Sequence, residues 1–111
     1  LGWHPVGIGE AVSIGVIVEL TFKPGSDGPA ELMRIMSDRL PSVTRPYDGC
    51  EYIHLYVDPE DANRYLLVQR WESRAKYDAY RDWAMAQDDT RTLQEHLQQD
   101  MTVSYLDDTG A

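Results

Sequence analysis

Residues 67–83 read LVQRWESRAKYDAYRDW, and this stretch decides the fold. It begins with the pattern of a strand that ends at Trp71, and it continues with the pattern of a helix that Ser73 would cap. Three more aromatic side chains follow on the helical part: Tyr77, Tyr80 and Trp83. We therefore expect a strand-to-helix corner whose rings either fill a core or line a cavity that a flat molecule enters.

The residues before this corner have the pattern of a β-hairpin. Residues 50–57 alternate as a strand, and residues 59–63, PEDAN, form a polar turn cluster. Residues 64–71 then return antiparallel, and Trp71 is in phase with Tyr65, Leu67 and Gln69. On the first hairpin strand, the two predicted faces are Cys50, Tyr52, His54 and Tyr56, and Glu51, Ile53, Leu55 and Val57.

The first third of the chain predicts one strand and one helix. The strand covers residues 14–22, and both of its faces contain apolar residues, so we expect both faces to be covered. Residues 23–31, KPGSDGPAE, supply a turn and a helix start with Ser26 or Asp27 as the N-cap. The helix presents one apolar stripe: Leu32, Ile35, Met36 and Leu40. Pro41 is expected to end this helix.

The residues after the corner predict the end of the fold. The helix capped by Ser73 breaks at residues 87–89, QDD, and a short helical piece follows that begins at Thr90 or Thr92. Residues 101–106, MTVSYL, form the last strand.

The order strand, helix, strand, strand, helix, strand predicts an α+β fold. Short connections and right-handed crossovers give the ferredoxin-like split βαβ arrangement, with a four-stranded antiparallel sheet and helices on one face. The second sheet face would then expose apolar and aromatic side chains, which monomers rarely tolerate as a large patch. We therefore predict a homodimer in which two copies meet through this sheet face.

Length and charge exclude several classes of protein. A chain of 111 residues predicts one domain, which we place over residues 13–107, between an irregular arm at residues 1–12 and a tail at residues 108–111. The net charge of −9 opposes binding to nucleic acid or to an anionic membrane. No apolar run is long enough to span a bilayer. The lone Cys50 and the missing export signal favour a cytoplasmic location.

Three features give the chain its resemblance to the antibiotic biosynthesis monooxygenase family. They are the first strand ending in FKPG at residues 22–25, the β-hairpin, and the segment RWESRAKYDAY at residues 70–80. Within that segment, the residues that fit the family pattern are Trp71, Ser73, Ala75 and Tyr77. Tyr80 departs from the pattern, because it stands where the family often has His.

The resemblance implies a dimeric α+β barrel with a pocket between the helices and the sheet of each monomer. Family members oxidise electron-rich polycyclic phenols to quinones with molecular oxygen, without flavin, haem or metal. Such a site has to hold a planar aromatic molecule, stabilise its deprotonated form and exclude bulk water.

Four residues are candidates for catalysis. Trp71 could stack on the substrate and donate its indole N–H to a developing oxyanion, or it could be a core aromatic. Tyr77 and Tyr80 share a helix face. One phenol could hydrogen-bond the ionised substrate and the other could shuttle a proton, or both rings could pack on the sheet. A tyrosine with an ordinary pKa is a poor base at neutral pH, so the substrate would ionise unaided or another residue would act. His54 has a suitable pKa for that base, or it is a structural or dimer residue.

The remaining candidates concern binding and cofactors. Residues expected to contact the substrate are Val18, Leu67, Gln69 and Trp83, with Arg91 at the pocket mouth or else solvated. The three histidines lack metal-ligand spacing, so no metal site is expected. Related dimers of this fold degrade haem with an Asn, a Trp and a His. The alignment places Val18, Tyr80 and Thr90 at those positions, which disfavours haem.

The resemblance therefore favours an oxygen-dependent monooxygenase that acts on a planar phenolic or quinol compound and needs no cofactor. A non-catalytic protein that binds an aromatic metabolite, or an assembly module, is the alternative from another class. A cyclase or isomerase on the same scaffold is a third reading.

Overall fold

The computed structural model describes residues 13–111, so the predicted arm at residues 1–12 lies outside the described residues. The elements follow in the order β1 (Ile14–Thr21), α1 (Gly28–Arg39), η1 (Leu40–Thr44), β2 (Cys50–Asp58), β3 (Asp61–Trp71), α2 (Arg74–Met85), α3 (Asp88–Glu95) and β4 (Thr102–Asp107). This order agrees with the predicted alternation of strands and helices.

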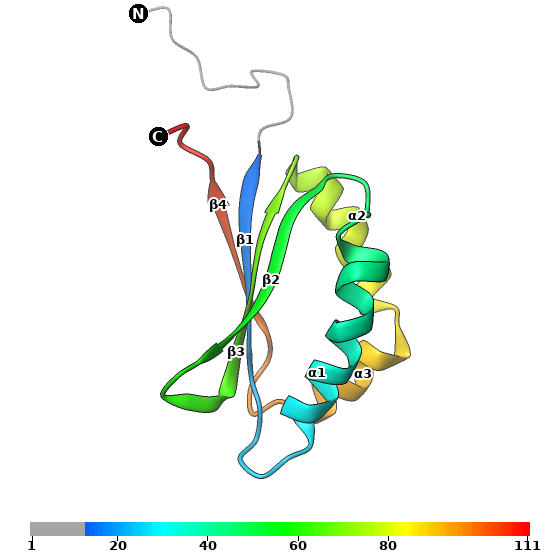
Figure 1. Ribbon diagram of the computed structural model, residues 1–111, viewed down its shortest axis with the longest axis vertical. Helices are drawn as coiled ribbons and strands as arrows, with labels where there is room; N and C mark the ends of the chain where they lie inside the picture. Colours follow the sequence, from blue (N-terminus) through cyan, green and yellow to red (C-terminus); the bar gives the residue numbers. More distant parts are fainter. Residues whose placement is uncertain (1–12) are drawn as a thin grey trace, which may run out of the picture.

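The strands form one antiparallel sheet in the order β2-β3-β1-β4. The helices α1, α2 and α3 all lie on one side of this sheet (Figure 1). This arrangement confirms the predicted ferredoxin-like α+β fold. The two layers, sheet and helices, enclose the core between them.

The core follows from two simple periodicities. Alternate side chains of β1 are buried because a strand turns successive side chains to opposite faces: Ile14, Val16, Val18 and Leu20. The predicted apolar stripe is buried against them, with Leu32, Ile35 and Met36 on α1 and Leu40 on η1. The prediction of this stripe is confirmed.

The strand-to-helix corner forms as expected. Ser73 is the N-cap of α2, and its hydroxyl accepts a hydrogen bond from the backbone N–H of Lys76 at 3.2 Å. Trp71, the last residue of β3, is fully buried, and Tyr77 and Tyr80 are buried on the inner face of α2. The corner therefore directs its rings into the space between the two layers.

Three local features differ from the predictions, one of them only in part, because α1 does end at Arg39 next to Pro41. The pairing of β2 with β3 shifts register between Cys50 and Tyr52, so Glu51 is an extra bulged residue and Cys50 shares the inner face with Ile53. Pro41 does not end the helical backbone. Because proline lacks an N–H, the α-helical ladder gives way to the wider π-helical turn η1.

The third difference is the start of α3. It begins at Asp88 with Gln87 as the N-cap, not at Thr90 or Thr92. Asp88 and Asp89 occupy the first turn, where carboxylates interact favourably with the positive end of the helix dipole.

Among residues 13–111, no helix lies on the second face of the sheet (Figure 1). Tyr56 and Leu106 on this face are 49% and 51% exposed. Within residues 13–111, only the face of β1 that packs against the helices is covered. The expectation that both faces are covered is therefore met on that side only. Within residues 13–111, no helix has the length and apolar character needed to cross a membrane.

Candidate functional site

A cavity of about 90 Å³ lies between the sheet and the helices. Most of its wall is apolar and comes from β1, β2, β3, β4 and α3: Val18, Leu20, Ile53, Leu67, Val103 and Leu93. The predicted contact residues Val18 and Leu67 thus lie where a bound molecule would touch them. A cavity of roughly 150 Å³ takes up benzene in an engineered protein, so this space is small for a polycyclic compound.

The partly exposed members of the wall mark the side from which a molecule could enter. Arg81 and Met85 belong to α2, and Met101 directly precedes β4. Met36 of α1 also lines the cavity. Methionine side chains are flexible and adapt to the shape of a neighbour. This wall can therefore widen more easily than a wall of branched residues.

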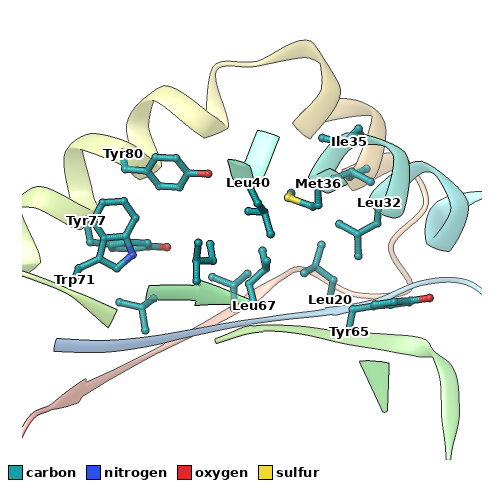
Figure 2. Close-up of a cluster of buried hydrophobic side chains, with 14 of the residues drawn as sticks. Leu20, Leu32, Ile35, Met36, Leu40, Tyr65, Leu67, Trp71, Tyr77 and Tyr80 are labelled. Atoms are coloured by element: carbon teal, nitrogen blue, oxygen red, sulfur yellow. The ribbon is translucent and has the colours of Figure 1, made fainter. Parts of the chain in front are cut away.

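Aromatic rings form a cluster at the corner end of the cavity. The rings of Trp71 and Tyr80 are stacked with centroids 5.0 Å apart, and Tyr77 meets Trp71 edge-on at 5.7 Å (Figure 2). Trp71 is itself covered by these neighbours and does not line the cavity. Its ring therefore cannot stack on a bound molecule in this arrangement.

The indole of Trp71 acts on the cavity through Gln69. Its Nε1–H donates to Oε1 of Gln69 at 2.9 Å. Because an indole nitrogen can only donate, this bond fixes which end of the amide faces Trp71. Gln69 is 4% exposed and lines the cavity, and its amide NH₂ group has no hydrogen-bond partner among residues 13–111. The two amide N–H donors are therefore left for a bound oxygen atom.

Tyr77 and Tyr80 both line the cavity. Their hydroxyls point away from the corner in the direction of Leu40 (Figure 2). The Tyr80 hydroxyl is 2.8 Å from the hydroxyl of Thr44. Burial raises the pKa of Tyr77, and burial also raises the pKa of Tyr80, partly offset by the Thr44 hydrogen bond and the charge of Arg39. Both phenols are therefore protonated at neutral pH and act as donors, not as bases.

Arg39 is a cavity residue that the sequence analysis missed. It is the last residue of α1 and is 7% exposed. Its Nη1 donates to Oγ1 of Thr90 at 3.2 Å, and its guanidinium lies 5.4 Å from the ring centroid of Trp83. A signal was present, because Arg39 follows Met36 by three positions and Ile35 by four and so continues the apolar stripe.

Besides Trp71, three predicted site residues do not line this cavity. His54 is exposed on the other face of the sheet, between the rings of Tyr52 and Tyr56 at 4.9 and 6.3 Å. Arg91 is exposed on α3 and forms an ion pair with Asp88. Trp83 lies behind the cavity, 6.0 Å from Tyr80. Residues 13–111 contain no group of three or more His, Cys, Asp or Glu side chains that could hold a metal ion.

Comparisons with known proteins agree on the kind of domain. Residues 13–88 match the family model described as antibiotic biosynthesis monooxygenase. The structure of Rv0793 from Mycobacterium tuberculosis is 26% identical with a TM-score of 0.69, and the match covers 85% of this chain and 92% of that one. The chain matches no curated protein sequence.

Two further structures are similar in fold at lower identity. A protein from Bordetella bronchiseptica is 22% identical with a TM-score of 0.68, covering 85% of this chain and 94% of the other. A protein from Nitrosomonas europaea is 13% identical with a TM-score of 0.74, covering 90% and 93%. The chain therefore spans nearly the full length of the structures that it resembles.

Proposed function

Because the chain belongs to the antibiotic biosynthesis monooxygenase family, we propose that it oxidises a planar phenolic or quinol compound to a quinone with molecular oxygen. The reaction type is inferred from the family, and the substrate class is inferred from the apolar wall of the cavity. In this proposal the substrate supplies the electrons, and no flavin, haem or metal takes part, as the family resemblance implies.

The observation that supports this proposal is the amide of Gln69. It is held by Trp71 in the orientation that presents two N–H donors to an apolar space. Donors fixed in advance stabilise an oxygen atom as it gains negative charge, and they do so more strongly where water is excluded. A phenolate or enolate oxygen of the substrate is such an atom. The Tyr77 hydroxyl, protonated and in the same wall, is a third donor.

The reaction can be written with atoms and electrons in balance. A carbanion resonance form of the ionised substrate adds to one oxygen atom of O₂, and loss of water then leaves a new carbonyl group. A ring CH₂ that becomes C=O gives up four electrons, and O₂ accepts four, since one oxygen atom ends in the carbonyl and the other in water. The substrate loses two hydrogens, one as the proton released on ionisation and one from the carbon that is oxidised, and solvent returns one proton to the oxygen that leaves as water.

The protein's part is to favour ionisation, since the wall offers no base. Among residues 13–111, the cavity is lined by no carboxylate and no imidazole. The first proton therefore leaves the substrate to solvent, and the donors lower the substrate's pKa by stabilising its anion. The substrate enters by displacing flexible side chains such as Met85 and Met101, because the closed cavity is smaller than one polycyclic compound.

The proposal is tested with purified protein, air-saturated buffer and a panel of anthrones and naphthols, each with and without a ring carboxyl group. Oxygen uptake and the quinone spectrum are recorded together. We expect uptake in the wild type and a loss of about 100-fold in kcat for Gln69→Leu, because one set of oxyanion donors is removed. Gln94→Leu, the same change at an exposed position of α3, is the matched control and should keep full activity. No uptake with any member of the panel would rule out the proposal.

The lack of a base in the described cavity wall also favours a second candidate, a protein that binds an aromatic metabolite without changing it. The same panel separates the two. Saturable quenching of tryptophan fluorescence without oxygen uptake supports the binding protein. Spectral change without oxygen uptake supports a cyclase or isomerase.

A further inference from the structure

Among the described residues Arg39 is a buried cation with no directly paired carboxylate, although Asp38 and Asp89 line an outer hollow together with it. It is 7% exposed, and among residues 13–111 it takes part in no ion pair. By contrast, Arg34, Arg64 and Arg70, all at least a third exposed, each pair with a carboxylate. Acidic residues outnumber basic residues in this chain, whose net charge is −9, yet its least exposed arginine pairs with no carboxylate among residues 13–111. A buried charge without a counter-charge is costly.

The groups that hold Arg39 are neutral. The Thr90 hydroxyl donates its proton to the carbonyl of Ala84 at 2.6 Å, so it can only accept from Arg39. Trp83 offers a ring face at 5.4 Å. The end of α1 does not supply the missing negative charge, because the helical backbone continues through η1 to Thr44. These contacts position the guanidinium, but they use one of its five N–H donors and cancel none of its charge.

Arg39 lines the same cavity as Gln69, Tyr77 and Tyr80, and it also borders the outer hollow. The unspent hydrogen-bonding groups of this cavity are thus mainly donors, and one of them carries a full positive charge. An apolar space of this kind fits an aromatic ring that bears an acidic oxygen group. The planar fork of a guanidinium matches the two oxygens of a carboxylate better than it matches one phenolate oxygen.

We propose that Arg39 is the receptor for a carboxylate on the ring system of the bound molecule, so that the substrate is an aromatic acid and not a neutral phenol. This inference rests on the proposed function only in calling the bound molecule a substrate. The anion site itself requires no reaction. In this arrangement the carboxylate pairs with Arg39 while Gln69 takes the oxygen at the reacting ring.

The test compares ligands that differ in charge and hardly in shape. Benzoate and benzamide, and 2-naphthoate and 2-naphthamide, are titrated into the protein at neutral pH, and the dissociation constants are measured by calorimetry. We expect the wild type to bind each acid about tenfold more tightly than its amide, which is the range of one charge-assisted bidentate pair. In Arg39→Met the preference should fall to about onefold while amide binding stays within about threefold of the wild type.

Two variants keep the result interpretable. Arg81→Met removes a cation from the same wall but at its exposed side, where Arg81 bonds the Tyr105 hydroxyl at 3.2 Å, and it should keep the preference for acids. Arg39→Gln can still donate to Thr90 and serves if Arg39→Met does not fold. A purely structural arginine would lower the melting temperature when replaced, whereas we expect Arg39→Met to melt at or above the wild-type temperature.

The proposal is overturned if wild type binds acid and amide equally, if it binds none of the four ligands, or if Arg81→Met abolishes the preference as fully as Arg39→Met does. These outcomes differ from failure of the proposed function. An acid preference without oxygen uptake on any substrate would refute the oxygenase and leave the anion site in place. If neutral naphthols support oxygen uptake and Arg39→Met leaves that uptake unchanged, the carboxylate receptor is refuted and the oxygenase is supported.

Discussion

Trp71 and Gln69 work as one unit at the scale of single residues. The sequence predicts a role for the indole N–H of Trp71, and the structure assigns that proton to the Gln69 side chain at 2.9 Å. Trp71 is therefore a positioning residue, because it acts on a bound molecule only through the amide that it orients. If this bond is lost, the Gln69 amide can rotate and its carbonyl oxygen can face the cavity.

A double-mutant cycle tests this coupling. We expect Trp71→Phe to lower kcat for oxygen uptake about tenfold, because the donors are still present but are no longer fixed. In a Gln69→Leu background the same change should lower kcat by less than about twofold. A core role alone predicts equal effects in both backgrounds. The free energy of unfolding, measured in urea, should fall by about 1–3 kcal/mol for Trp71→Phe in either background.

The tyrosines give a prediction about pH. Burial raises the pKa values of Tyr77 and Tyr80, so neither phenol ionises between pH 6 and its ordinary value near 10. The rise of activity with pH should therefore follow the ionisation of the substrate. Two naphthols whose own pKa values differ by about one unit should give kcat/KM profiles displaced by the same amount and in the same direction. Profiles with one shared midpoint would point to an ionising group on the protein instead.

Single residues also show why the site could be predicted only in part. Leu67, Gln69 and Trp71 share a strand face, and period-two alternation predicts their inward direction. Alternation does not predict that Trp71 donates to Gln69 and is shielded from the cavity. Arg39 continues an apolar stripe, but its burial depends on Thr90, 51 positions away in the chain. Contacts across such distances are not encoded in local spacing.

At the scale of elements, the strands are joined by a cluster of charges on the outer face. Arg64 of β3 bonds Glu19 of β1 at 2.9 and 3.0 Å, and it bonds Asp58 at the end of β2 at 3.0 Å. The hydrogen bond from Arg64 holds the pKa of Glu19 below its ordinary value. The pKa of Asp58 is also lowered, mainly by the hydrogen bond from the backbone N–H of Glu60 and next by the one from Arg64. This cluster connects the central strand to both strands of the hairpin.

The cluster predicts an acid-sensitive contribution to stability. Because the folded-state pKa of Glu19 is lower than its unfolded value, the contribution is full above about pH 4.5 and is lost as the pH falls through the folded value. The melting temperature of the wild type should therefore drop more between pH 5 and pH 3 than that of Glu19→Gln. Glu95→Gln, on the exposed side of α3, should follow the wild type. Parallel curves for wild type and Glu19→Gln would contradict the prediction.

The elements that sequence patterns predicted well are those whose signals are local. The alternation of β1 and the stripe of α1 depend on neighbours within one or two turns, and both are found as expected. The bulge at Glu51 has no such signal, because either alternation of β2 places an aromatic or aliphatic set on the inner face. The pairing with β3 decides between them, since Cys50 lies opposite Trp71. Register is a property of two strands and not of one.

At the scale of the whole molecule, the sheet face that no helix of residues 13–111 covers is the surface through which the chain could assemble. Its apolar and aromatic side chains come from β2, β3 and β4: Tyr52, Tyr56, Leu66, Val68 and Leu106. The hydroxyls of Tyr52 and Tyr56 bond each other at 2.8 Å, so these two rings present a joint apolar surface. Val68 lies near the middle of this face, where its partners across the sheet are His54 and Ile17. Such a surface fits a second copy of itself.

We propose that two copies of the chain meet through this face, and one charge at its centre tests the prediction. The wild type should have the mass of a dimer in sedimentation equilibrium at micromolar concentration, and Val68→Glu should shift it to the mass of a monomer, because two buried carboxylates would face each other across the two-fold axis. Met33→Glu is the matched control, since Met33 is 49% exposed on α1, on the helix side of the molecule, and this variant should remain a dimer. Since the cavity proposed to bind the ligand lies between the sheet and the helices of one chain, the Val68→Glu monomer should keep its ligand affinity within about threefold if it stays folded. A wild type that sediments as a monomer, or a Met33→Glu variant that dissociates while Val68→Glu does not, would place the contact elsewhere or remove it.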